Sequence, residues 1–309
     1  MKRTLFKPIL IATLSIITIL GVASGTIAII NKSTNRDIAT EVVDVPGSEP
    51  PYNFDYSWVK NNPYIAHAFG GILGDSYTNS YEAFLLNYQL GHRVFEVDFY
   101  LTDDGYTVAA HDDANWRKVA AIPSDAEIKN STTDDQFTYA NFMSSLWYDK
   151  YHPVDLTLLF EILQQYPDVY IVTDTKFSDE ENVRKQFTAF VETAKATDLA
   201  LLDRFIPQIY VPEMLPWIMD IYPWKSVIYT LYGNPDWTPE NVLAFSQDSG
   251  VKCITRWDTW LNERLTSDEI SNWKSANINI ATHTINNYAR AENSRTRGAN
   301  VIYTDFLLP

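Results

Sequence analysis

Short runs of β-branched and aromatic residues alternate along most of the chain with helix-length segments. Nine strands are expected, at residues 64–67, 93–100, 106–111, 169–175, 205–210, 226–231, 251–255, 277–285 and 300–304. Helices are expected between most of them, for example at residues 79–90, 179–197, 239–248, 267–275 and 287–297. Strands that alternate with helices in this way predict a parallel sheet covered by helices.

The turn between the second and third strands sets the strand count. Only residues 101–105 separate these two strands, and they end in Asp104-Gly105, a dipeptide typical of hairpin turns. One antiparallel strand among nine leaves eight parallel strands, each followed by a helix. We therefore predict an α/β fold of the (β/α)8 (TIM) barrel class. Residues 112–153 are too many for an ordinary loop and predict a small insertion over the barrel mouth.

Helix boundaries are marked by capping residues. Ser178, Thr238 and Ser267 stand where helix N-caps are expected, since their side-chain oxygens can accept from exposed backbone N–H groups. Gly91 and Gly298 stand where helices should end, because glycine adopts the left-handed conformation that closes a helix.

The first thirty residues have a different pattern. Lys2, Arg3 and Lys7 precede an uncharged, mostly apolar run over residues 8–30. As a helix this run would be about 34 Å long, enough to cross a hydrocarbon core of about 30 Å. We predict a transmembrane anchor with residues 1–7 in the cytoplasm. The alternative is a cleaved signal peptide; both place the remaining domain outside the cell.

Residues 31–60 have mixed polarity and three prolines, and predict a stem between the membrane and a barrel over residues 61–309. The composition, 46% hydrophobic and 20% charged over 309 residues, suits one large globular domain. A net charge of −15 argues against nucleic acid as a partner. Cys253 is the only cysteine, so no internal disulfide can form.

Candidate chemistry lies at the strand ends, where barrels of this class carry their reactive groups. Glu96 and Asp98 are two residues apart in one strand and share a face. Phe95, Val97 and Phe99 occupy the other face and must pack against the outer helices. The two carboxylates are therefore expected to point into the barrel.

Two like charges inside a barrel are costly unless a cation or base neutralises them. Asp174, at another strand end, supplies a third carboxylate, and we predict an oxygen-ligated Ca²⁺ or Mg²⁺ on Glu96, Asp98 and Asp174. Zinc is disfavoured because the chain has no Cys–His cluster. His67 and His111, also at strand ends, can flank a phosphate as acid and base, and Lys176 can contact a phosphate oxygen.

Other residues near strand ends have weaker signals. His283 lies near the end of an expected strand and can face the pocket, while Trp257 follows one and can contact a sugar, glycerol or acyl group. We retain both as substrate-binding candidates, with packing as the alternative for Trp257. His92, after Gly91, is expected to be exposed.

Taken in order, the motifs resemble the glycerophosphodiester phosphodiesterase family, within the group that includes phosphatidylinositol-specific phospholipases C. The matching segments are IAHAFGGILGDSYTNSYEAF, GHRVFEVDFYLTDDGYTVAAHDD, YIVTDTK, FIPQIY, IATHTINN and GANVIYTDF. The resemblance implies the acid–base pair, the metal ligands and the phosphate contact named above, with Ca²⁺ or Mg²⁺ as the ion. It also implies attack by a neighbouring substrate hydroxyl.

The chain departs from the family pattern at two positions. Ala68 stands where the family has an arginine that contacts phosphate, and Asp174 replaces the usual glutamate. Arg93, Arg117 and Arg256 are candidates to replace the arginine. The spider-type sphingomyelinase D enzymes also lack it.

Three functions follow from these observations. We expect a divalent-metal-dependent hydrolase of glycerophosphodiesters or glycerol-phosphate polymers at the cell surface, anchored by one transmembrane helix or secreted after cleavage. The first alternative is a phospholipase of the sphingomyelinase D or phosphatidylinositol-cleaving type. The second is a non-catalytic surface protein that keeps the barrel for binding.

Overall fold

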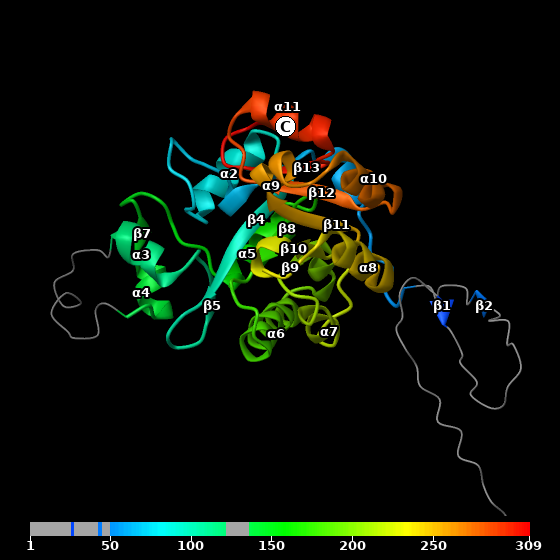
Figure 1. The fold of residues 1–309 in the computed structure, drawn as a ribbon. Helices are drawn as coiled ribbons and strands as arrows, with labels where there is room; N and C mark the ends of the chain where they lie inside the picture. The colour runs from blue at the N-terminus through cyan, green and yellow to red at the C-terminus, as the bar shows by residue number, and fades with distance from the viewer. Residues whose placement is uncertain (1–25, 28–42, 45–49, 122–135) are drawn as a thin grey trace, which may run out of the picture. The chain divides into compact units, whose positions relative to one another are not determined.

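A computed structural model describes residues 26–27, 43–44, 50–121 and 136–309 (Figure 1). The chain divides into two units, Met1–Glu49 and Pro50–Pro309. In the first, β1 (Thr26–Ile27) pairs antiparallel with β2 (Val43–Asp44). The predicted cytoplasmic tail (residues 1–7) and the predicted span (residues 8–30) lie outside the described residues, apart from β1. Within the described ranges, no helix is long and apolar enough to cross a membrane.

Pro50–Pro309 folds around a closed barrel of parallel strands. The sheet closes because β3 pairs with both β13 and β4. This confirms the predicted (β/α)8 class. The eight strands are β3 (Tyr64–Ala66), β4 (Val94–Leu101), β8 (Tyr170–Asp174), β9 (Phe205–Ile209), β10 (Ile228–Thr230), β11 (Cys253–Trp257), β12 (Asn279–His283) and β13 (Val301–Thr304).

The predicted hairpin is also present. β5 (Thr107–Ala109) runs antiparallel to β4, with Phe99 opposite Ala109, and lies outside the ring of eight strands.

Helices surround the strands (Figure 1). The five expected helices form within about two residues of their expected ends, and α5, α7 and α9 are added to them. The helices around the barrel are α2 (Tyr81–Gln89), α5 (Leu156–Gln165), α6 (Glu180–Ala196), α7 (Met214–Met219), α8 (Pro239–Ser249), α9 (Asp258–Glu263), α10 (Ser267–Ser275) and α11 (Tyr288–Arg297). Short 3₁₀ turns stand at η1 (His67–Phe69), η3 (Leu199–Arg204) and η4 (Leu231–Gly233).

One of the three predicted helix N-caps is confirmed. Thr238 caps α8 in a capping box, as predicted. The other two predicted caps are wrong by one residue, because Asp179 rather than Ser178 caps α6 and Thr266 rather than Ser267 caps α10. Thr266 is favoured because it stands three residues before a glutamate that completes the capping box.

The insertion after β5 is a small subdomain beside the barrel (Figure 1). It contains α3 (Asp113–Val119), β6 (Ala120–Ala121), α4 (Tyr139–Ser144) and β7 (Leu146–Trp147). Buried Trp116 and Trp147 belong to the same apolar core as the outer face of the barrel strands. The described part of the insertion is therefore fixed to the barrel by packing.

Apolar side chains form two main layers. One lies between the strands and the outer helices, and the other fills the barrel interior. At the N-terminal end of the barrel, α1 (Ser57–Asn61) contributes Trp58 to the interior layer, and its indole Nε1 donates to Ser226 Oγ at 3.0 Å. The interior layer consists of Trp58, Ile65, Val94, Val172, Ile206, Ile228, Cys253, Ala281, Val301 and Tyr303.

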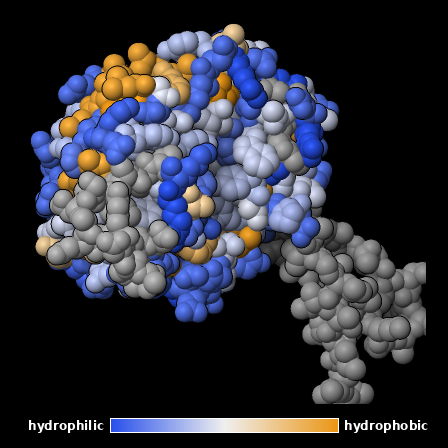
Figure 2. Space-filling model, turned by 90° about the vertical axis from the view of Figure 1, so that its left-hand side faces the viewer, coloured by the Kyte–Doolittle hydropathy of each residue, from blue (hydrophilic) through white to orange (hydrophobic). Residues whose placement is uncertain are grey.

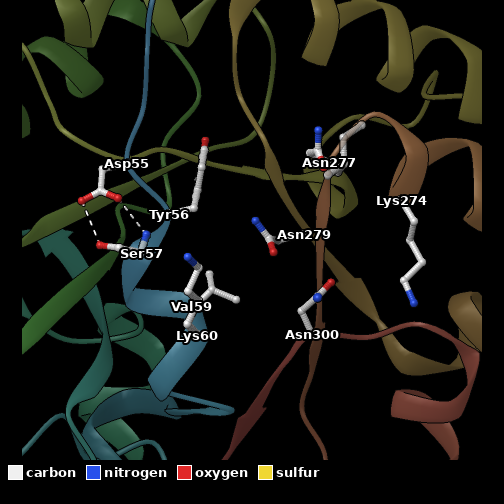
Figure 3. Close-up of a pocket in the computed structure, with 10 residues that line it drawn as sticks. Asp55, Tyr56, Ser57, Val59, Lys60, Lys274, Asn277, Asn279 and Asn300 are labelled. Carbon is white, nitrogen blue, oxygen red and sulfur yellow. Dashed lines mark hydrogen bonds between the residues drawn. The ribbon is translucent and has the colours of Figure 1, made fainter.

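A cavity of about 670 Å³ lies at this N-terminal end, between α1 and the residues that lead into β12 and β13 (Figure 3). Asn277, Asn279 and Asn300 line it together with residues of α1. On its rim, the Asp55 carboxylate accepts from the backbone and side chain of Ser57. The lining contains no histidine and one carboxylate, so this cavity does not match the predicted chemistry.

The face of the molecule in Figure 2 is predominantly hydrophilic, and hydrophobic atoms gather in one area at its upper left. This surface agrees with a strongly charged protein of net charge −15.

Candidate active site

The carboxylates sit at the C-terminal ends of strands whose inward positions begin as apolar residues. In β4 the inward series runs Val94, Glu96, Asp98, and in β8 it runs from Val172 to Asp174. Glu96 and Asp98 are 1% and 0% exposed, and Asp98 is the register partner of Asp174. The flanking Phe95, Val97 and Phe99 pack in the outer core. The inward orientation predicted for Glu96 and Asp98 is thus confirmed.

The three carboxylates form one cluster. One oxygen from each of Glu96, Asp98 and Asp174 lies within 4.8 Å of the other two. Glu96 Oε1 is buried without a hydrogen-bond partner among the described residues. Oxygen donors alone, grouped closely and incompletely satisfied, fit a hard divalent cation such as Ca²⁺ or Mg²⁺.

Lys176 shares this centre. Its Nζ lies 2.5 Å from Asp98 Oδ1 and 2.5 Å from Asp174 Oδ2. Burial, together with Asp98, raises the pKa of Glu96 well above its usual range. Burial also acts to raise the pKa of Asp98, but Lys176 and the two histidines outweigh it and lower that pKa. The ammonium therefore neutralises part of a cluster whose charge favours a cation.

His67 follows β3 in η1 and points over the cluster. Its Nδ1 lies 2.8 Å from Asp305 Oδ1, and its Nε2 lies 3.9 Å from Glu96 Oε2. Burial opposes protonation of this imidazole, but the Glu96, Asp305 and Asp98 carboxylates outweigh it and raise its pKa to about 9. Asn286 Nδ2 donates to Asp305 Oδ2 at 2.7 Å and holds this carboxylate in place.

His111 reaches the same centre from the hairpin. Its Nδ1 lies 2.5 Å from Oδ2 of Asp112. The other oxygen of that carboxylate, Oδ1, accepts a hydrogen bond from the backbone N–H of Asn115. The two histidines meet at one ring, because Tyr77 contacts His67 with centroids 4.6 Å apart and His111 with centroids 5.6 Å apart. Both contacts are edge-on. The structure thus brings together the two histidines that the sequence placed on separate strands.

The opposite wall of the mouth is aromatic. The Tyr232 hydroxyl lies 3.3 Å from Asp174 Oδ2, and its ring is parallel to that of Trp257 with centroids 6.0 Å apart. His283 contacts Tyr232 edge-on, its Nδ1 lies 3.0 Å from Thr255 Oγ1, and its Nε2 has no partner among the described residues. Burial, with nearby positive charges, lowers the pKa of His283 to about 3, so this imidazole is neutral.

Sequence reasoning missed four residues of this site. Asp305 directly follows β13, and Tyr232 lies two residues beyond the inward Thr230, so strand-end position and alternation could have found both. Asn79 accepts from the Asp98 backbone and donates to its carboxylate. Neither Asn79 nor Tyr77 lies in a strand, and no periodic signal marks a loop residue.

Two of the three arginines proposed to replace the family arginine, Arg93 and Arg117, lie outside the site. Arg93 precedes β4 at the opposite end of the barrel and pairs with Asp168. Arg117 lies on α3 beside Asp113. Arg256 has the outward register of β11, and its guanidinium lies over Trp237 and beside Trp257 of the aromatic wall. Ala68 itself is buried, and its backbone N–H donates to Glu96 Oε2 at 2.8 Å.

His92 differs from expectation. It is 2% exposed rather than exposed, because the C-terminal segment covers it and its Nε2 lies 3.0 Å from the carbonyl oxygen of Leu307.

The model of the Glycerophosphoryl diester phosphodiesterase family matches residues 71–308, which is most of the chain. The chain belongs to this family. The resemblance inferred from the motifs is therefore confirmed, as is the enzyme class, because the glycerophosphoryl diester phosphodiesterases are phosphoric diester hydrolases. No curated protein matches the sequence.

Solved structures share the fold at low identity. A glycerophosphodiester phosphodiesterase from Parabacteroides distasonis is 16% identical with a TM-score of 0.60, over 79% of this chain and 93% of the other. A phosphodiesterase from Oleispira antarctica, solved with the product sn-glycerol-3-phosphate, is 18% identical with a TM-score of 0.59, over 79% and 92%. A glycerophosphodiester phosphodiesterase from Thermotoga maritima is 16% identical with a TM-score of 0.56, over 79% and 94%.

Proposed function

We propose that this phosphodiesterase acts outside the cell on glycerophosphodiesters or glycerol-phosphate polymers of the cell surface, with a divalent cation and a two-histidine acid–base pair. One observation carries the proposal. His67 and His111 meet around Tyr77 above three buried carboxylates, and Glu96 Oε1 in this cluster is unsatisfied among the described residues.

Each group has a role that its surroundings support. Glu96, Asp98 and Asp174 would hold the cation, which when bound neutralises charge on the phosphoryl oxygens. Asp305 holds Nδ1 of His67, and Asp112 holds Nδ1 of His111. Each imidazole is thereby left with Nε2 for proton transfer to or from the substrate.

Substrate groups beyond the phosphate would contact the aromatic wall. Trp257 is 47% exposed beside Tyr232, and Nε2 of His283 is free among the described residues to accept or donate a hydrogen bond. The product bound in the Oleispira antarctica neighbour supports a glycerol-phosphate moiety in this chain's substrate. Lys176 would contact a phosphate oxygen once released from one of its two carboxylates.

The cellular location rests on the sequence. The basic residues before the apolar run 8–30 support a membrane anchor with the barrel outside, or secretion if the run is cleaved. The absence of an internal disulfide is compatible with either, because the barrel interior and outer core are extensively packed.

A phospholipase activity is the second candidate, and one observation favours it. Leu73, in the loop after η1, is 84% exposed, and Phe306, which lies against Gly71 in the same loop, is partly exposed. Exposed apolar side chains beside a catalytic mouth suit contact with a lipid surface.

Turnover by the full-length protein tests the proposal. We would measure hydrolysis of sn-glycero-3-phosphoethanolamine, a poly(glycerol phosphate) and phospholipid vesicles, each with Ca²⁺, with Mg²⁺ and with EDTA. His67→Ala and His111→Ala would be compared with His152→Ala, an exposed histidine that pairs with Glu82 outside the site.

We expect cation-dependent turnover that both site variants lose and His152→Ala keeps. Preference for vesicles would establish the phospholipase alternative instead. No turnover of any substrate, with unchanged binding of sn-glycerol 3-phosphate in the histidine variants, would indicate a binding protein.

A further inference from the structure

Tyr77 occupies a position that the proposed acid–base pair does not explain. Its ring meets both imidazoles edge-on, at interplanar angles of 88° with His67 and 80° with His111. The side chain is 38% exposed, so part of it faces solvent at the mouth. A bulky aromatic residue between the two histidines either keeps substrate away from them or contacts the substrate itself.

The loop that carries Tyr77 is held firmly. Asn87 Nδ2 donates to the carbonyl oxygens of Phe69 and Gly71 at 3.1 Å each. Gly70, at φ +87°, allows this approach, because a Cβ there would lie 2.4 Å from Asn87 Nδ2. At its other end, the loop is tied to Asp98 through Asn79.

Tyr77 itself adopts φ +59°, in the left-handed region. A bulky residue in this region is strained, and such strain persists where the surrounding structure enforces it, often at functional sites. The fixed loop therefore presents this ring to the histidines at a cost in backbone energy, which is consistent with a functional position.

The Tyr77 phenol, placed against both histidines, lies near the charges of the carboxylate centre. Burial, with the Asp305, Asp98 and Glu96 carboxylates, raises its pKa to about 12, so the phenol is protonated at neutral pH. It makes no hydrogen bond to another residue in the described ranges. The nearby ammonium of Lys176 is already shared between two carboxylates. Tyr77 is thus a neutral donor available where a phosphodiester would need one.

We propose that Tyr77 is a substrate-binding residue: its hydroxyl donates a hydrogen bond to a non-bridging phosphoryl oxygen, while its ring fixes the two imidazoles on either side of the phosphate. The inference rests on the proposed phosphodiesterase activity. A fixed donor aimed at an oxygen that gains charge during the reaction stabilises the transition state. The ring contact adds a positioning role through His67 and His111.

Two substitutions separate the hydroxyl from the ring. Tyr77→Phe removes the donor and keeps both ring contacts, whereas Tyr77→Leu removes both. Tyr106→Phe is the matched control, since Tyr106 is an exposed tyrosine in the β4–β5 hairpin that packs on Tyr139. For each full-length variant we would measure kcat/KM on the best substrate, inhibition by sn-glycerol 3-phosphate, the pH profile and Tm.

We expect Tyr77→Phe to lower kcat/KM about 10- to 100-fold and to weaken inhibition by sn-glycerol 3-phosphate, as loss of a hydrogen bond to a charged group does. Its pH profile and Tm should match the wild type, and Tyr77→Leu should also shift the pH profile. Wild-type kcat/KM in Tyr77→Phe, or an equal loss in Tyr106→Phe, would overturn the inference. An inactive wild type would overturn the proposed function instead.

Discussion

The two ends of the barrel use the same strands and the same inward register for different purposes. On β4 the inward series starts at Val94 and ends at Asp98, and on β8 it starts at Val172 and ends at Asp174. The N-terminal end is closed by Trp58 over an apolar layer. The C-terminal end holds like charges that no apolar packing offsets.

Histidines show the same contrast. His67, at the mouth, has its pKa raised to about 9, because nearby carboxylates outweigh burial. His92, before β4, has its pKa lowered to about 4 by burial, which Arg93 reinforces. The N-terminal end and the outer core thus bury apolar side chains and a neutral histidine, whereas the mouth keeps buried charges suited to ligand binding.

The largest expected effect separates activity from stability at the mouth. Glu96→Gln should lower kcat/KM about 10³-fold, because it weakens the cation site, an effect of about 4 kcal/mol on the transition state. Tm should not fall, since the substitution removes a buried charge beside Asp98 and keeps an oxygen for the Ala68 N–H. Glu82→Gln, outside the site, is the control. A fall in Tm with unchanged turnover would show that Glu96 stabilises the fold and does not serve the cation site.

The opposite result is expected at the closed end. Trp58→Ala should destabilise the fold by about 3 to 5 kcal/mol, because it leaves a cavity in the interior layer. Urea unfolding followed by circular dichroism measures this change. Turnover per folded molecule should stay at the wild-type value, and loss of turnover without loss of stability would show that the two ends are coupled.

Acid should destabilise the protein through His92. Its folded-state pKa of about 4 lies below the ordinary 6.5, so the unfolded chain takes up the proton first. Stability present above pH 6.5 is therefore lost as pH falls towards 4, by up to about 3 kcal/mol.

His92→Gln lacks this titration and is the comparison. Urea unfolding at several pH values should show the wild type losing more stability than the variant between pH 6.5 and 4. Parallel curves for the two proteins would contradict the burial argument.

The smallest expected effect concerns the aromatic wall. Trp257→Ala should change stability by less than about 0.5 kcal/mol, because the side chain is half exposed. It should raise KM about 2- to 10-fold through loss of a ring contact with substrate. An unchanged KM for every substrate would remove Trp257 from the substrate-binding residues.

Much of the fold followed from alternation in the sequence. All nine expected strands form, seven within their expected ranges, while β4 and β11 run one and two residues past theirs. Apolar runs of strand length are bounded by clear turn signals. The bounds of α7 and α9 were not predicted, because six-residue helices carry too few turns to show a period. The N-terminal anchor remains a prediction.

Residues of the site on strands were predictable from the sequence, whereas those in loops were not. Glu96, Asp98 and Asp174 were predictable because strand alternation fixes where a side chain points. Tyr77 and Asn79 were not, because their positions depend on left-handed loop residues and on hydrogen bonds to Asp98. Whether another arginine could replace the family arginine also depended on tertiary position, which excluded Arg93 and Arg117.

Anomalous diffraction from crystals of the full-length protein soaked in Mn²⁺, a surrogate for Ca²⁺ or Mg²⁺, tests the central claim most directly. We predict one strong peak about 2.0 to 2.6 Å from oxygens of Glu96, Asp98 and Asp174, with Lys176 Nζ displaced from at least one carboxylate. Saturating Mn²⁺ that leaves the cluster without a peak and Lys176 Nζ between Asp98 and Asp174 would contradict a cation-dependent site.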